Sequence, residues 1–164
     1  MIKLPLKTIF IYMFFLLVIF AIDRISKIYI LNILENKGVV DIYLTSFINL
    51  IFVWNKGIGF GFLSFENNIF YNSITILIII INILLLYFLI SSKGFRSYSF
   101  LMILGGSLGN LFDRLYYSAV PDFIDLNYNG FHWFVFNFAD IFISIGIICL
   151  IFDEILNNKN KNVY

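Results

Sequence analysis

Two aspartates in this sequence stand among apolar neighbours, where a carboxylate has no cheap structural purpose. Asp122 lies between Val120-Pro121 and Phe123-Ile124, and Asp140 begins the apolar run IFI at 141–143. Two carboxylates in a poorly solvated site cannot both ionise easily, so one keeps a proton while the other serves as a base. Hydrolysis of a peptide bond by an activated water requires such a pair. The two residues are therefore candidates for aspartic-protease chemistry, which uses neither a covalent intermediate nor a metal.

Further charged residues occur at the ends of apolar segments, where ionisable groups are costly and usually face a cavity or a partner. They are Asp23, Arg24, Lys27, Asp113, Arg114 and Asp125. A structural explanation stays open for Arg24 and Lys27 of this set, and for Glu35 and Asp41 outside it, since these residues can serve as interfacial anchors. Asp23 and Lys27 are four residues apart, so on a helix they share a face and can pair.

The elements that position these residues follow from composition. Of 164 residues 61% are hydrophobic and only 13% charged, against about a quarter charged in a soluble domain. A helix needs about 20 apolar residues to cross a bilayer. We predict an all-α integral membrane protein, a single domain over 1–164, with four transmembrane helices at about 8–31, 69–90, 98–117 and 134–155. The outer loops fall at about 32–68 and 118–133, and alternation over 47–54 predicts some β structure there.

Basic residues give the orientation. They precede the first span, link the second to the third and follow the fourth: Lys3, Lys7, Lys93, Arg96, Lys159 and Lys161. The positive-inside rule places that side, and hence both termini, in the cytoplasm. No small-x-small cleavage site follows the first apolar segment, so we interpret it as an uncleaved anchor.

Five motifs occur in order along the chain. They are DRISK at 23–27, NKGIGF at 55–60, GGSLGNLFDR at 105–114, VPDF at 120–123 and FNFAD at 136–140. In these motifs, and in length and number of spans, the chain resembles the lipoprotein signal peptidases (signal peptidase II). Two departures stand out: Ser118 where the family usually has Gly, and Gly59 where it usually has Ala or Ser. Both bear on loop geometry and substrate preference.

The resemblance implies roles for individual residues. The catalytic pair falls on Asp122 and Asp140. Substrate binding or support of the site is implied for Asn55, Gly57, Asn110, Asp113, Arg114, Asn137 and Ala139. Structural roles are expected for Asp23, Lys27, Gly105 and Gly109. The Gly105-xxx-Gly109 spacing permits close helix approach, and Asp113 with Arg114 can form an ion network.

The implied reaction removes signal peptides from diacylglyceryl-modified bacterial prolipoproteins, with cleavage before the lipidated cysteine. The expected partners are these substrates and membrane lipids, with no nucleic acid and no cofactor, and the chain is expected to be monomeric. The expected location is the cytoplasmic (inner) membrane, with the active site at its outer face.

Three other classes fit less well. A transporter would place its acids near the bilayer midplane, with broken helices and repeats, which the sequence lacks. A metal hydrolase needs more ligands than His132, the single histidine, which we interpret as an interfacial anchor. A Ser–Lys peptidase would have to use Ser26 and Lys27, which as helix neighbours point in different directions. The lone Cys149 offers no disulfide and is expected to be a small apolar filler.

Overall fold

The computed structural model describes residues 4–57, 68–128 and 131–161. It contains four helices and four strands in the order α1 (Leu6–Lys37), β1 (Asp41–Tyr43), β2 (Ile48–Asn55), α2 (Asn68–Ser91), α3 (Phe95–Tyr117), β3 (Val120–Tyr128), β4 (Phe131–Phe136) and α4 (Phe138–Lys161). The strands form one antiparallel sheet in the order β1-β2-β3-β4.

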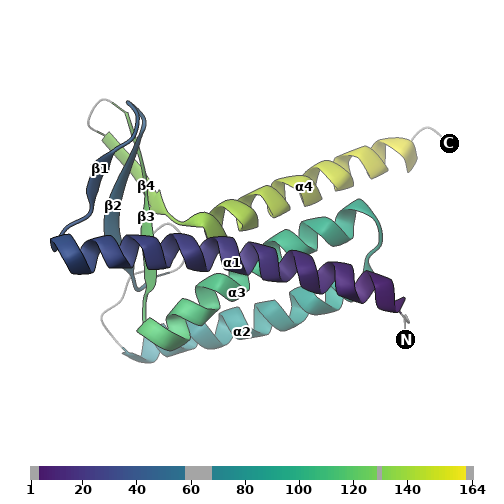
Figure 1. Cartoon of the computed structure of the whole chain (residues 1–164). Coiled ribbons are helices and arrows are strands. Elements are labelled where there is room, and N and C mark those ends of the chain that lie inside the picture. The colour runs from purple at the N-terminus through teal and green to yellow at the C-terminus, as the bar shows by residue number, and fades with distance from the viewer. Residues whose placement is uncertain (1–3, 58–67, 129–130, 162–164) are drawn as a thin grey trace.

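The sheet stands at one end of the helices, and both chain ends point away from it (Figure 1). Helix α3 packs against α1, α2 and α4, so it forms the centre of the bundle. An apolar cluster joins the sheet to the helices, with Ile30 of α1 against Phe123 and Ile124 of β3. This contact fixes the sheet over the helix ends where the charged motifs lie.

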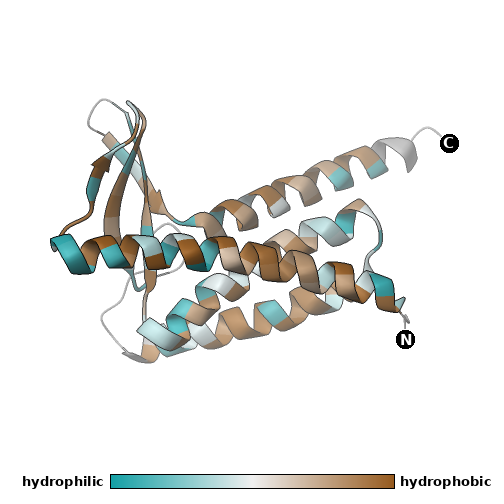
Figure 2. Ribbon diagram, viewed as in Figure 1, coloured by the Kyte–Doolittle hydropathy of each residue, from teal (hydrophilic) through white to brown (hydrophobic). Residues whose placement is uncertain are grey.

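The helix surfaces are strongly apolar along most of their length (Figure 2). Two helices, Leu6–Lys37 and Tyr71–Ser91, are long and apolar enough to cross a membrane by length and composition. Side chains such as Ile83 of α2, Leu115 of α3 and Phe152 of α4 are more than half exposed, which suits a lipid environment better than water. The expected four helices are thus present, and two of them meet this criterion for a span.

The predicted start of the fourth helix, near residue 134, is wrong. Residues 134–136 belong to β4, and α4 begins at Phe138. Hydropathy could not locate this boundary because strand and helix are both apolar, and a short apolar run does not reveal its period. The predicted loop at 118–133 is mostly a β3–β4 hairpin. The strand expected at 47–54 is confirmed as β2.

Glycines on α3 allow its neighbours to approach closely, as the Gly105-xxx-Gly109 spacing predicts. A Cβ on Gly105 would lie 2.9 Å from Cγ2 of Ile19, and one on Gly109 would lie 2.6 Å from Oδ2 of Asp23. A Cβ on Gly106 would collide with the backbone oxygen of Ala139. At these glycines, α1 and the first turn of α4 therefore approach the same stretch of α3 more closely than any side chain would allow.

Candidate active site

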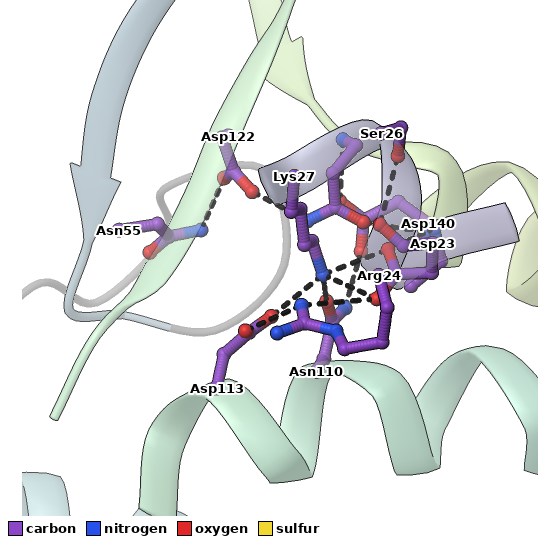
Figure 3. Close-up of polar contacts among 11 residues, drawn as sticks. Asp23, Arg24, Ser26, Lys27, Asn55, Asn110, Asp113, Asp122 and Asp140 are labelled. Atoms are coloured by element: carbon purple, nitrogen blue, oxygen red, sulfur yellow. Dashed lines mark hydrogen bonds and ion pairs between the residues drawn. The ribbon is translucent and has the colours of Figure 1, made fainter. Parts of the chain in front are cut away.

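Asp122 and Asp140 lie close together where the sheet meets the helices (Figure 3). Asp122 comes from β3 and is 1% exposed, and Asp140 comes from the first turn of α4 and is 7% exposed. The structure therefore brings together the two carboxylates that stood out in the sequence, and it removes both from bulk solvent.

Asn137 is bonded to both carboxylates and also caps the start of helix α4. Its Oδ1 accepts a hydrogen bond from the Asp140 backbone N–H at 3.2 Å, and its own N–H donates to Oδ2 of Asp140 at 3.1 Å. This reciprocal pattern is a capping box, which satisfies two of the free N–H groups at a helix start. The side-chain NH₂ group of Asn137 donates from Nδ2 to Oδ1 of Asp122 at 2.6 Å.

Two further asparagines donate to the carboxylate oxygens that Asn137 does not contact. Asn55 donates from Nδ2 to Oδ2 of Asp122 at 2.8 Å, and Asn110 donates from Nδ2 to Oδ1 of Asp140 at 2.8 Å. The amide oxygen of Asn55 accepts from the backbone N–H of Gly57 at 2.8 Å. Each carboxylate oxygen thus receives one N–H group from the protein.

The electrostatic setting of Asp122 makes it a weaker acid than an ordinary aspartate. Burial raises the pKa of Asp122 to about 7, and the nearby charge of Asp140 adds to the rise. Hydrogen bonds from Asn55 and Asn137 lower the pKa, because they favour the ionised form. A carboxyl group that titrates near neutrality can supply a proton under physiological conditions.

A buried ion cluster stands directly behind the pair. The Nζ atom of Lys27 lies 2.8 Å from the Asp23 carboxylate, 2.6 Å from Oδ2 of Asp113 and 3.0 Å from Oδ1 of Asn110. Arg24 completes the cluster, with Nη2 at 2.5 Å from Oδ1 of Asp113. The interpretation of Arg24 and Lys27 as interfacial anchors is therefore wrong, since both are buried in ion pairs. Glu35 and Asp41 are exposed.

The pairing of Asp23 with Lys27 is confirmed, and Asp23 has a second contact. Its Oδ1 accepts a hydrogen bond from the backbone N–H of Ala139 at 3.1 Å. Ala139 is fully buried and lies in the first turn of α4. Asp23 therefore ties α1 to the helix start that carries Asp140, and a carboxylate there also suits the helix dipole.

Arg114 has a different partner from the one expected. Its neighbour Asp113 pairs with α1, whereas the Arg114 guanidinium donates to the backbone oxygen of Gly57 and lies over the ring of Tyr71 at 5.8 Å. Arg114 thus holds the backbone at Gly57, two residues after Asn55, against α3. The expected network of Asp113 with Arg114 is replaced by these separate contacts.

Of the two departures from the family pattern, Gly59 lies outside the described residues. Ser118 ends helix α3 in the left-handed region, with φ of 57°. Glycine adopts this conformation without steric cost. A serine at this position therefore strains the turn before β3.

One contact was not predicted from the sequence. Asp125 of β3 is fully buried, and its Oδ2 lies 2.7 Å from Nδ1 of His132 on β4. His132 is thus both half exposed and paired across the hairpin. This contact cannot be recognised from the sequence, because it depends on the pairing of β3 with β4, in which Asp125 faces Val135 and His132 faces Asn127. Within residues 4–57, 68–128 and 131–161, no group of three or more His, Cys, Asp or Glu side chains is placed so that it could hold a metal ion.

The structure also contains an apolar cavity of about 440 Å³. It lies between the sheet, the second half of α1 and the start of α4, and its lining includes Tyr29, Leu50, Phe123, Phe136 and Ile141. Phe123 and Ile141 directly follow Asp122 and Asp140 in the chain. The residues that directly follow the two carboxylates thus line a space suited to hydrocarbon, whereas Asp122 and Asp140 themselves do not line it.

Comparisons with known proteins agree with these features. The profile of the Signal peptidase (SPase) II family matches residues 15–156. A lipoprotein signal peptidase of Pelagibacter ubique is 50% identical over 161 residues, which are 98% of this chain and 97% of that protein. One of Rickettsia canadensis is 39% identical over 152 residues, covering 87% of this chain and 76% of that protein.

Solved structures agree as well. Two structures of bacterial membrane enzymes, each 28% identical, superpose with TM-scores of 0.78 and 0.71. The first covers 97% of this chain and 94% of the other, and the second covers 93% and 96%. With its apolar helices, the chain is thus a membrane protein of known architecture, and it belongs to the signal peptidase II family of proteases.

Proposed function

We propose that this protein is an aspartic endopeptidase that removes signal peptides from diacylglyceryl-modified prolipoproteins, with Asp122 and Asp140 as its catalytic residues. The observation that carries the proposal is the buried carboxylate pair bridged by Asn137, at 2.6 Å from Asp122 and 3.1 Å from Asp140. The names of the relatives supply the substrate class, and cleavage before the lipidated cysteine is part of the proposal.

The contacts of the pair favour a division of roles. Asp140 lies at the N-terminal end of α4 and accepts from a backbone N–H and from Asn110, an environment that suits an ionised base. We assign the proton to Asp122, which is buried on β3 and accepts hydrogen bonds from two neutral side-chain amides. Asp140 then takes a proton from water, whose oxygen attacks the scissile carbonyl, while Asp122 protonates the carbonyl oxygen. As the C–N bond breaks, Asp140 gives the proton that it took from water to the leaving amine, and Asp122 recovers its proton from a hydroxyl of the tetrahedral intermediate.

The same proposal includes four membrane crossings with both termini in the cytoplasm. Its support is the position of both chain ends opposite the sheet (Figure 1) and the apolar side chains exposed on all four helices. The sheet and the carboxylate pair would then lie at the outer face of the cytoplasmic membrane. There the apolar cavity beside Phe123 could receive the acyl part of a substrate without withdrawing it from the membrane.

Substitution of each carboxylate tests the chemistry. With purified protein in detergent and a synthetic lipidated prolipoprotein, Asp122→Asn and Asp140→Asn should each abolish detectable cleavage, since neither amide can exchange the required proton. Asp125→Asn is the matched control, because Asp125 is equally buried on the same strand. It should keep activity within about threefold of wild type, as expected for a residue outside the chemistry.

Two results would contradict the proposal. One is wild-type activity in either the Asp122→Asn or the Asp140→Asn variant, provided that the protein remains folded and membrane-inserted. The other is loss of activity with a chelator and its recovery with a divalent metal, which would point to metal-assisted hydrolysis instead.

A further inference from the structure

The three asparagines around the carboxylate pair share one feature: the amide oxygen of each is bound by a group that can only donate. Asn55 accepts from the N–H of Gly57 and Asn137 from the N–H of Asp140. Asn110 accepts from Nζ of Lys27 at 3.0 Å. Because the oxygen end of each amide is fixed in this way, the NH₂ end must face a carboxylate.

Lys27 differs from the other two donors because it is a charged side chain and can be exchanged by mutation. It is fully buried, and its ammonium group has no acceptor capacity. Its three neighbours at hydrogen-bond distance, the carboxylates of Asp23 and Asp113 and the Asn110 amide, account for its three N–H groups. Its orientation is therefore determined by all three.

We propose that Lys27 is a positioning residue for the reaction: by holding the Asn110 oxygen it aims the Asn110 NH₂ group at Asp140 and keeps Asp140 the ionised member of the pair. The inference rests on the proposed function and deepens it. An NH₂ group opposite Oδ1 cannot accept a proton from Asp140, so a proton on that oxygen would have no partner. With the amide reversed, the oxygen of Asn110 would instead favour a protonated Asp140.

The charge of Lys27 acts in the same direction. The charged groups around Asp140 are Asp23 and Lys27 on α1 and Asp122 on β3, with Arg24 and Asp113 completing the cluster behind Asn110. Asp23, Arg24, Lys27 and Asp113 together are neutral, with two negative and two positive groups. Loss of Lys27 alone would leave the cluster with one buried negative charge in excess, which destabilises the fold. A single substitution would therefore not separate the effect on the orientation of Asn110 from the effect on folding.

Two double variants separate these effects. Lys27→Met/Asp113→Asn and Arg24→Met/Asp113→Asn each remove one positive and one negative group, so the cluster stays neutral in both. Only the first also removes the contact with Asn110, since Arg24 pairs with Asp113 and Asp23. Any loss that comes from Asp113 or from the cluster as a whole is common to both variants, and the difference between them reports the Lys27–Asn110 contact.

We expect kcat of the Lys27 double variant to be about 10- to 100-fold below that of the Arg24 double variant. KM should change little, because Lys27 does not touch substrate. The acidic limb of the pH–rate profile should move upward by about one pH unit, as the ionised form of the pair loses a nearby cation and a fixed donor. Equal kcat values and superimposable pH profiles for the two variants would overturn the proposal.

A second pair of variants keeps the test decisive if the double variants do not fold. Lys27→Arg keeps a charged group that only donates, whereas Lys27→Gln can turn its own oxygen or its NH₂ toward Asn110. The acidic limb should stay in place in Lys27→Arg and move upward in Lys27→Gln. Unmoved limbs in both would overturn the proposal. Failure of the proposed function would show separately, as absent cleavage by the wild-type protein in the same assay.

Discussion

Asparagine is the side chain through which both acidic groups of the site are held. An amide suits this position because it offers an acceptor at one end and two donors at the other, so it can join a helix start or a backbone turn to a carboxylate. Asn137 uses both ends, since it caps α4 and donates to Asp122. The two tasks use different atoms and can be separated by mutation.

Asn137→Ser should separate them. Serine is a good N-cap and would keep the acceptor for the Asp140 N–H, but it lacks the amide donor to Asp122. We expect a Tm in detergent within a few degrees of wild type and a kcat lowered about 10- to 100-fold. Asn137→Ala, which loses the cap as well, should cost about a further 1 kcal/mol of stability. Equal stability losses in the two variants would argue against the capping role.

The raised pKa of Asp122 predicts the sign of a pH effect. If Asp122 must be protonated, activity should fall as pH rises through the neutral range, where its pKa of about 7 lies. The hydrogen bond from Asn55 lowers that pKa. Asn55→Ala should therefore raise the pKa of Asp122 further and move the alkaline limb of the pH–rate profile to higher pH. An alkaline limb that stays in place while the acidic limb moves to higher pH would show instead that Asp122 acts in its ionised form.

Among the secondary-structure elements, α3 determines where the strand that carries Asp122 begins. It ends at Ser118, whose φ of 57° is left-handed, and it passes directly into the strand that carries Asp122. Ser118 is exposed, so its side chain contributes little and the backbone conformation dominates the effect of a substitution.

Ser118→Gly should stabilise the protein by about 0.5–1 kcal/mol, because glycine adopts the left-handed region without steric cost. A Tm measured by nanoscale fluorimetry in detergent would show this as a rise of a few degrees. Ser118→Ala is the control and should show no gain. A lower Tm in the glycine variant would mean that loss of chain entropy outweighs the relief of strain.

Across the whole molecule, the position of the sheet opposite both termini defines a topology that labelling can test. In a Cys149→Ala background, Tyr43→Cys places an exposed thiol on β1, and Lys93→Cys places one in the link between α2 and α3. A membrane-impermeant maleimide should label the first in intact spheroplasts and the second only after permeabilisation. The reverse pattern would invert the proposed orientation.

The sequence allowed the helices, β2 and the proximity of Asp122 and Asp140 to be predicted, because long apolar runs and ordered motifs are local signals. The burial of Lys27 could not be predicted, since its three partners include residues 83 and 86 positions away. The start of α4 was missed although a signal was present: Asn137 and Asp140 have capping-box spacing, which places a helix start at residue 138. The catalytic roles themselves remain predictions that mutation must test.

The capping box at α4 has a consequence for how this protein could evolve. Helix N-termini accept glutamate at the third position as readily as aspartate, so the helix start alone would tolerate Asp140→Glu. The longer side chain would displace the carboxylate from Asp122 and from the Asn110 amide, and the reaction would lose its base at the required position. Folding and chemistry thus select on the same side chain by different criteria, and only the chemistry excludes a change of a single methylene group.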